Sequence, residues 1–251
     1  MNSFATSAIV FACVFGGALL GFLLRRILPN HHLSPESRDL VKLGIGTIAT
    51  MSALVLGLLV ASAKSTYDAQ SREVTEMSAK IILLDRVLAH YGPDAKEARE
   101  QLKEIVTLAL VRMWPKNHAE RSLAAAKPFR AEVLYDKIQD LVPTNDVQRG
   151  IQNRALSIAF DIGQMRWLMI EQGYSPASLP LIVVVVFSLT ISFMSFGLNA
   201  PPNGTVLATF LLSALSVSGV MFLILEMYTP LGGYLEVSDA PMRAALGYLG
   251  Q

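Results

Sequence analysis

The residues of this chain that could do chemistry are few and scattered. His31 and His32 are neighbours, His90 and His118 are isolated, and Cys13 is the single cysteine and lies in an apolar run. Neighbouring histidines rarely converge on one metal ion, and no carboxylate or cysteine stands at a matching spacing. A lone cysteine cannot form an intrachain disulfide and is best explained as a small hydrophobic residue. We therefore expect no bound metal and no cofactor.

Catalytic signatures are absent as well. The chain has no phosphate-binding Gly-x-x-x-x-Gly-Lys loop, no Gly-x-Ser-x-Gly elbow, no His-Glu-x-x-His and no Cys-x-x-Cys. A membrane enzyme would place several histidines or carboxylates near its spans, and these are missing. The net charge of +1 gives no indication of a nucleic-acid partner. The sequence therefore argues against an enzyme.

The apolar runs indicate an integral membrane protein. Hydrophobic residues make up 52% of the 251 residues and charged residues only 16%, against about 25% charged in an average soluble domain. Charge-free runs of about 20 residues are long enough to cross the hydrocarbon core as helices. The turn-forming NAPPNG, at 199–204, divides the last long run into two. We predict four spans, at 4–24, 43–63, 179–198 and 205–225.

The charged region between the second and third spans, 64–178, predicts a water-facing helical bundle. Apolar residues recur there at spacings of three and four, which is typical of amphipathic helices. No glycine or proline separates Lys64 from Tyr91, so the second span should continue into this region without a break. Further helices are expected between Pro93 and Pro115, near 128–143, and from Thr144-Asn145-Asp146 to Gly173. We predict an all-α fold, with this bundle inserted between spans two and three of a single domain, 1–251.

Small residues within the spans have two explanations. Gly17 and Gly21 form a Gly-x-x-x-Gly pair, which is typical of close helix packing. In span two, one side carries Gly46, Thr50, Ala53, Gly57 and Ala61, and an adjacent line carries Met51, Leu54 and Leu58. These faces could pack against other helices, or one of them could line a pore in which aliphatic side chains gate by dewetting.

Two stretches resemble a known family. Residues 54–70, LVLGLLVASAKSTYDAQ, are similar to the second span of the uncharacterised bestrophin-like membrane proteins of bacteria and plants. The C-terminal signature of that family is matched by Glu226, Pro230-Leu231-Gly232-Gly233, Leu235-Glu236-Val237-Ser238 and Ala240-Pro241. Leu231 replaces the usual Phe. The resemblance covers nearly the whole chain, since the order of the spans also agrees.

The resemblance implies distant kinship with bestrophins, which are pentameric anion channels with a pore lined by the second span. Three apolar side chains spaced four apart line that pore, and the matching positions here are Thr50, Leu54 and Leu58. The aromatic residues of the bestrophin neck are replaced by aliphatic ones and a threonine. The acidic cluster that binds Ca²⁺ in bestrophins is also missing after Pro230-Leu231, so calcium gating is not expected.

The resemblance also implies a role for residues 226–251 as a structural clamp. Glu226 ends span four, Pro230 terminates the helix, and Gly232 and Gly233 permit a sharp reversal. The following residues would run along the soluble helices, with Ser238 capping a short helix. The clamp would tie span four to the long helix that leaves span two.

The sequence thus predicts an oligomeric membrane channel for small inorganic ions, preferably anions, with Lys64 at the pore mouth. The alternative is a non-conducting oligomeric scaffold whose small residues serve packing alone. The expected partners are the lipid bilayer and further copies of the chain, as a pentamer by kinship. Basic residues near the spans are balanced between the two sides, so they do not set the orientation. Kinship places the protein in a bacterial inner membrane with the bundle and both termini in the cytoplasm.

Overall fold

The computed structural model describes residues 2–27, 35–115, 120, 122, 132–173, 179–201, 203–229 and 233–251. Over these residues the chain forms helices, turns and irregular segments, and no strand. It divides into two compact units. The first unit holds Met1–Thr66 and Pro176–Tyr228, and the second holds Tyr67–Ser175 and Thr229–Gln251. The predicted all-α class is therefore confirmed.

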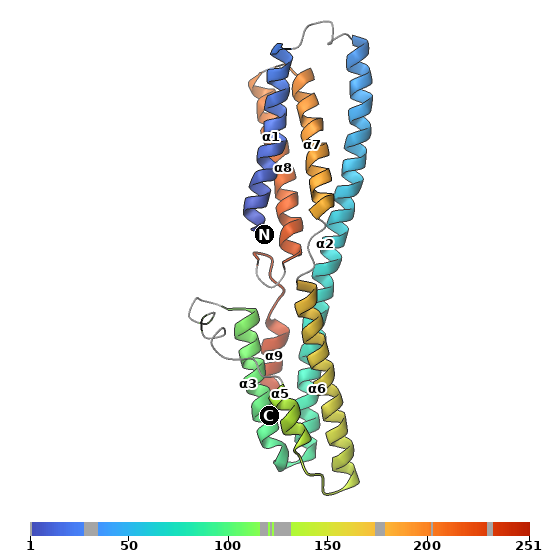
Figure 1. The fold of residues 1–251 in the computed structure, drawn as a ribbon. Helices are drawn as coiled ribbons and strands as arrows, with labels where there is room; N and C mark the ends of the chain where they lie inside the picture. Colours follow the sequence, from blue (N-terminus) through green and yellow to red (C-terminus); the bar gives the residue numbers. More distant parts are fainter. Residues whose placement is uncertain are drawn as a thin grey trace. The chain divides into compact units, whose positions relative to one another are not determined.

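The first unit consists of four apolar helices: α1 (Ser3–Ile27), the part of α2 (Pro35–Tyr91) up to Thr66, α7 (Leu179–Asn199) and α8 (Gly204–Met227) (Figure 1). All four helices to which these segments belong are long and apolar enough to cross a membrane, as the sequence predicts. The valine-rich run of α7 is helical although β-branched residues favour strands, because a helix satisfies its own backbone in lipid.

Two hydrogen bonds fix the relative directions of α1, α7 and α8. Arg25, near the end of α1, donates to the carbonyl oxygen of Ala200, just after α7. Ser218 Oγ, late in α8, donates to the carbonyl oxygen of Ser7, early in α1, at 2.7 Å. α1 and α7 therefore run in the same direction and α8 runs opposite to them, as Figure 1 shows.

Glycines bring α1 and α7 into backbone contact. A Cβ atom added at Gly21 would lie 2.0 Å from the carbonyl oxygen of Met194, and one at Gly17 would lie 2.8 Å from that of Thr190. The same holds from the other side, where a Cβ at Gly197 would lie 2.2 Å from the carbonyl oxygen of Ala18. The predicted packing role of Gly17 and Gly21 is confirmed.

The second unit is a helical bundle. It contains the rest of α2, the short 3₁₀ helix η2 (Pro93–Ala95), α3 (Lys96–Met113), α5 (Glu132–Gln139), α6 (Asp146–Gly173) and α9 (Ala240–Tyr248). α2 continues without a break to Tyr91, as predicted from its lack of glycine and proline. Its apolar stripe is buried in the core, where the least exposed residues include Val74, Leu84, Leu88, Leu102 and Ile138.

Gly92 ends α2 with a backbone that other residues rarely adopt. Its φ is +120° and its ψ is −169°, a region that is accessible chiefly to glycine. A Cβ added there would meet nothing within 4 Å. The requirement for glycine is therefore conformational and does not come from crowding.

A buried ion pair joins α2 to α3. Asp85 is 1% exposed, and its two carboxylate oxygens accept hydrogen bonds from Arg99 Nε at 2.8 Å and Arg99 Nη2 at 3.0 Å. The hydrogen bonds with Asp85 raise the pKa of the Arg99 guanidinium above its ordinary value, against the opposing effect of burial. The two-pronged geometry matches the planar guanidinium to the carboxylate.

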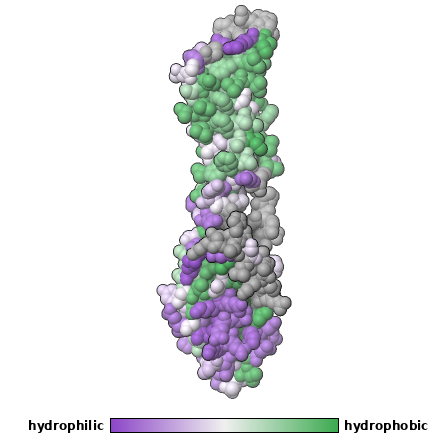
Figure 2. Space-filling view, turned by 90° about the vertical axis from the view of Figure 1, so that its left-hand side faces the viewer, coloured by the Kyte–Doolittle hydropathy of each residue, from purple (hydrophilic) through white to green (hydrophobic). Residues whose placement is uncertain are grey.

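The surfaces of the two units differ in hydropathy. On the face shown in Figure 2, hydrophobic residues cover the first unit and hydrophilic residues dominate the second. The exposed side chains of the first unit include Phe4, Leu43, Leu54, Leu58, Phe187 and Leu212. Such a surface requires an apolar surrounding for the first unit.

Candidate functional site

Within the first unit, α2 has one covered and one uncovered side. Ile45, Ser52, Leu59 and Ala63 are buried. At 100° per residue, Thr50 and Leu54 lie roughly opposite Ser52. Leu54 is 67% exposed and Leu58 62% exposed, and Thr50 is exposed as well. The three residues predicted to line a pore thus share a face that the first unit leaves open, and their role in a pore stays a prediction.

The small residues of α2 lie on uncovered parts of the helix. Gly46, Ala53, Gly57 and Ala61 are exposed, and a Cβ added at Gly46 or Gly57 would meet nothing within 4 Å. Of the apolar stretch of α2 only 17% is buried, against 33% in α1 and α7 and 22% in α8. The glycines of α2 therefore do not serve packing within the unit, unlike Gly17 and Gly21 of α1.

The uncovered face offers carbon atoms rather than ion ligands. The Thr50 hydroxyl donates to the carbonyl oxygen of Gly46 at 2.8 Å, so its proton is used within the helix. Leu54 and Leu58 supply only methyl groups. Lys64 is exposed and follows at the end of the apolar stretch. An ion passing this face would meet an apolar barrier without a binding site and then a positive charge.

In the C-terminal segment, Tyr228 Oη donates to Ser62 Oγ of α2 at 3.1 Å within the first unit, whereas the residues after Gly233 contact the second unit. Trp114 Nε1 donates to the carbonyl oxygen of Val237 at 2.8 Å, and Tyr67 Oη donates to that of Glu236 at 3.3 Å. Val237 is buried in the core together with Met242, Ala245 and Leu249 of the same segment. The segment therefore binds α2 at the start of its part in this unit, at Tyr67, and the C-terminal end of α3, at Trp114.

The residues proposed for the clamp are only partly described. Pro230 and Gly232 lie outside the described residues, while Gly233 is described and Glu226 is buried in the last turn of α8, at 3% exposure. The predicted capping by Ser238 is confirmed by its hydroxyl, which accepts a hydrogen bond from the Ala240 N–H in the first turn of α9 at 3.2 Å. Asp239 lies between them at the N-cap position, and its side chain makes no cap hydrogen bond.

Comparison with known proteins assigns most of the chain to a family. The profile of the Bestrophin-like domain matches residues 12–242. The chain belongs to the bestrophin-like family. This family member is similar in fold to the crystal structure of a mutated bacterial bestrophin homologue from Klebsiella pneumoniae, with a TM-score of 0.60 and 14% identity over 95% of this chain and 99% of that one. No match was found among curated proteins.

The structure also shows what the sequence interpretation overlooked. Asp85 stands three and four residues from Leu88 and Ile81 of the apolar stripe, so a carboxylate on the buried face was a readable signal of an ion pair. Its partner Arg99 could not be identified from the sequence, because the pairing depends on how α3 packs against α2. Among the histidines, His90 is exposed, and His31, His32 and His118 lie outside the described residues. The described part of the chain holds no cluster of three or more potential metal ligands.

Proposed function

We propose that this bestrophin-like protein is a subunit of an oligomeric membrane channel that passes small ions, preferably anions, through a pore lined by α2. The observation that carries the proposal is the uncovered, uncharged face formed by Thr50, Leu54 and Leu58 on the helix that is least covered by the first unit. In a symmetric ring, the same face from each subunit would point to the central axis. The alternative is a non-conducting scaffold in which this face meets lipid or a neighbouring helix.

The small residues of α2 favour an oligomer. Without a hydrophobic driving force in lipid, helices associate where small side chains let their backbones approach. Gly57 has open space around it in the single chain, and a neighbouring subunit would fill it. We propose a homo-oligomer, and a pentamer by kinship.

A ring of leucines would act as a gate. Leu54 and Leu58 are one turn apart, and rings of such side chains repel water without coordinating an ion. Preference for anions would come from the positive field at the pore mouth, to which Lys64 contributes. No catalytic step is part of this proposal.

The two units would act together as one domain in the bacterial inner membrane. Residues 64–178 would form the water-facing bundle on the cytoplasmic side, and residues 226–251 would clamp the bundle to the spans. The contacts of Trp114 and Tyr67 with this C-terminal segment support its attachment to the bundle, and the hydrogen bond from Tyr228 Oη to Ser62 Oγ supports its attachment to α2 in the first unit. A reporter fused to Gln251 that is active only outside the cytoplasm would contradict this orientation.

Flux through reconstituted protein tests the channel. The double substitution Leu54→Ala with Leu58→Ala should increase chloride flux into liposomes, because it widens and wets the constriction. The matched control is Leu211→Ala with Leu215→Ala, which removes two exposed leucines four residues apart on α8 and should leave flux unchanged. Lys64→Glu should lower the ratio of chloride to cation permeability.

The scaffold makes the opposite prediction. If wild type and the α2 double variant both pass neither chloride nor any small cation across a range of voltages and pH values, the channel proposal must be given up. If the α2 variant instead loses its oligomeric state on size exclusion while the α8 control keeps it, the leucines pack against a neighbouring helix.

A further inference from the structure

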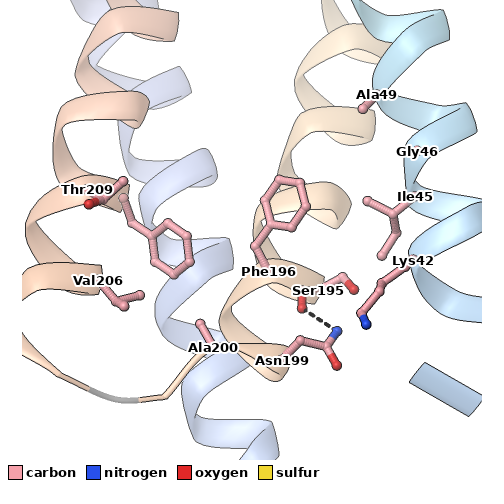
Figure 3. A pocket seen from close by; sticks show the side chains of 11 residues that line it. Lys42, Ile45, Gly46, Ala49, Ser195, Phe196, Asn199, Ala200, Val206 and Thr209 are labelled. Carbon is pink, nitrogen blue, oxygen red and sulfur yellow. Dashed lines mark hydrogen bonds between the residues drawn. The ribbon is translucent and has the colours of Figure 1, made fainter. Parts of the chain in front are cut away.

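A cavity opens between α2, α7 and α8 at one end of the first unit. Its volume is about 560 Å³, within the range of about 300–1,000 Å³ for small-molecule sites. α2 contributes Lys42, Ile45 and Ala49 to its wall, and α7 contributes Ser195 and Asn199, as Figure 3 shows. α8 contributes Phe210. The cavity lies where the apolar stretch of α2 begins, since Lys42 is the last charged residue before it.

The walls of the cavity change from polar to apolar with depth. Lys42 and Asn199 stand at the outer end, and their polar groups approach each other from opposite sides. Ser195 lies one helical turn further in, and Ala49 lies two turns inward from Lys42. At 1.5 Å per residue, the distance along α2 from Lys42 to Ala49 is about 10 Å. This depth accommodates a polar head and the beginning of an apolar chain.

Besides the cavity itself, the unpaired hydroxyl of Ser195 points to a ligand. The residue is only 8% exposed, and its hydroxyl has no hydrogen-bond partner among the described residues. Its side chain points from α7 toward Ile45 and Lys42 on α2. Leaving a buried hydroxyl unpaired costs free energy. Most other span hydroxyls avoid this cost by bonding a backbone carbonyl, as Thr190 and Ser192 do on the same helix.

We propose that this cavity binds a phospholipid with an anionic headgroup. The Lys42 ammonium group would contact the phosphate, the Ser195 hydroxyl would donate to an ester carbonyl of the glycerol linkage, and the acyl chain would lie against Ala49, Phe196 and Phe210. The order of phosphate, ester and chain in the lipid matches the order of cation, hydroxyl and apolar wall in the cavity.

The neighbouring groups permit this assignment. Lys42 pairs with Asp39 at 3.0 Å, but both side chains are largely exposed, and such pairs contribute little. Asn199 Nδ2 donates to the Ser195 carbonyl oxygen at 3.0 Å, which occupies one of the two N–H groups of that amide. Arg25 donates a hydrogen bond to the carbonyl oxygen of Ala200, which places a second positive charge at this end of the unit.

The test measures retained lipid on the purified full-length protein by native mass spectrometry, after equilibration with equal amounts of phosphatidylglycerol and phosphatidylcholine. The wild type should retain about fivefold more phosphatidylglycerol, since one lysine near an anionic headgroup is worth about 1 kcal/mol. Lys42→Gln should reduce that ratio to about one. Excess inorganic phosphate should not displace the lipid, because the acyl chain supplies most of the contact.

Two matched variants separate occupancy of the cavity from general effects. Gly46→Leu places a side chain in the cavity wall and should abolish retention. Gly44→Leu makes the same change two residues away on α2, where the cavity is not reached, and should retain lipid as the wild type does. Equal retention by both variants would show that the lipid sits elsewhere.

The role of Ser195 has its own readout. Ser195→Ala should lower retention of ester-linked phosphatidylglycerol and leave that of an ether-linked analogue, which lacks the carbonyl, unchanged. A wild type that binds the ester and ether lipids equally would contradict the assignment of the hydroxyl.

The remaining outcomes overturn the proposal. If phosphate alone displaces the lipid, the site binds inorganic anions. If wild-type protein retains no lipid and Gly46→Leu alone dissociates the oligomer, a second copy of the chain fills the cavity. None of these measurements depends on ion conduction, so the lipid site stands or falls separately from the channel.

Discussion

The two units are held together by different interactions. In the first, α1 and α7 meet through glycines that bring one backbone against the other. In the second, large side chains of five helices share one apolar core, and the ion pair between Asp85 and Arg99 joins α2 to α3 inside it. Helix association in lipid depends on close packing, whereas a water-facing bundle gains stability from burying apolar surface. α2 supplies residues to both units, but its glycines make no close backbone contact in the first.

The largest effect is expected from Asp85→Ala. Removing one partner of a buried ion pair leaves the other charge uncompensated, which costs about 3–5 kcal/mol. The melting temperature of the second unit should fall by about 10 °C or more. Both tryptophans, Trp114 and Trp167, lie in that unit, so the thermal transition in tryptophan fluorescence reports on it selectively.

A double substitution is the control for this prediction. Asp85→Leu with Arg99→Leu removes both charges together and should recover most of the loss, since buried pairs can be replaced by apolar residues at little cost. A double variant as unstable as Asp85→Ala would show that the loss comes from packing and not from the unpaired charge.

An intermediate effect is expected from Gly21→Ala in the first unit. The new methyl group would lie 2.0 Å from the Met194 carbonyl oxygen, so α1 and α7 must move apart at a cost of about 1–3 kcal/mol. Gly16→Ala on the same helix meets nothing within 4 Å and should be neutral or stabilising by up to about 1 kcal/mol. The measurement is loss of helical circular dichroism on heating in detergent.

Because the two units are stabilised differently, circular dichroism and tryptophan fluorescence should respond differently to Gly21→Ala. Gly21→Ala should shift the circular dichroism transition more than the tryptophan transition. A shift of equal size in both would mean that the two units unfold together.

The smallest effect is expected from the exposed pair between Lys137 and Glu97, whose charged atoms are 2.6 Å apart. The hydrogen bond to Lys137 lowers the pKa of Glu97 below its ordinary 4.5, and the same bond raises the pKa of Lys137 above its ordinary 10.5. The stabilisation is therefore present between these ordinary values. It is lost as pH falls through the lowered pKa of Glu97 or rises through the raised pKa of Lys137.

Lys137→Gln should lower the melting temperature of the second unit at neutral pH by under about 2 °C, since the pair is exposed. The difference from wild type should shrink in high salt and vanish once the pH has fallen below the lowered pKa of Glu97. A difference that persists there would mean that Lys137 acts through its aliphatic stem.

Much of the fold was readable because its determinants are local. The charge-free runs indicated four membrane helices, and the absence of glycine and proline after Lys64 predicted the continuation of α2 to Tyr91. The start of α6 was readable too, since Asn145 accepts a hydrogen bond from the Gln148 N–H at 2.8 Å. Each of these features depends on residues that are close in sequence.

Features that depend on distant partners were not readable. The Gly17-x-x-x-Gly21 pattern predicted a close helix contact, but it could not identify α7 as the partner. A similar pattern of small residues on α2 makes no close contact within the unit. The cavity at Lys42 is made by residues more than 140 positions apart in the sequence (Lys42 to Ser195). The lining of a pore by Thr50, Leu54 and Leu58 depends on further copies of the chain, and therefore stays a prediction.

The backbone conformation of the turn after α2 favours one chirality of residue at position 92. Gly92 has φ +120° and ψ −169°, and the mirror image of this pair lies in the broad β region that L-residues prefer. A D-alanine at position 92 would therefore sit in its own favoured region. In protein made by chemical ligation, D-alanine should fold as glycine does while L-alanine strains the turn. This position selects the chirality of a residue rather than its size.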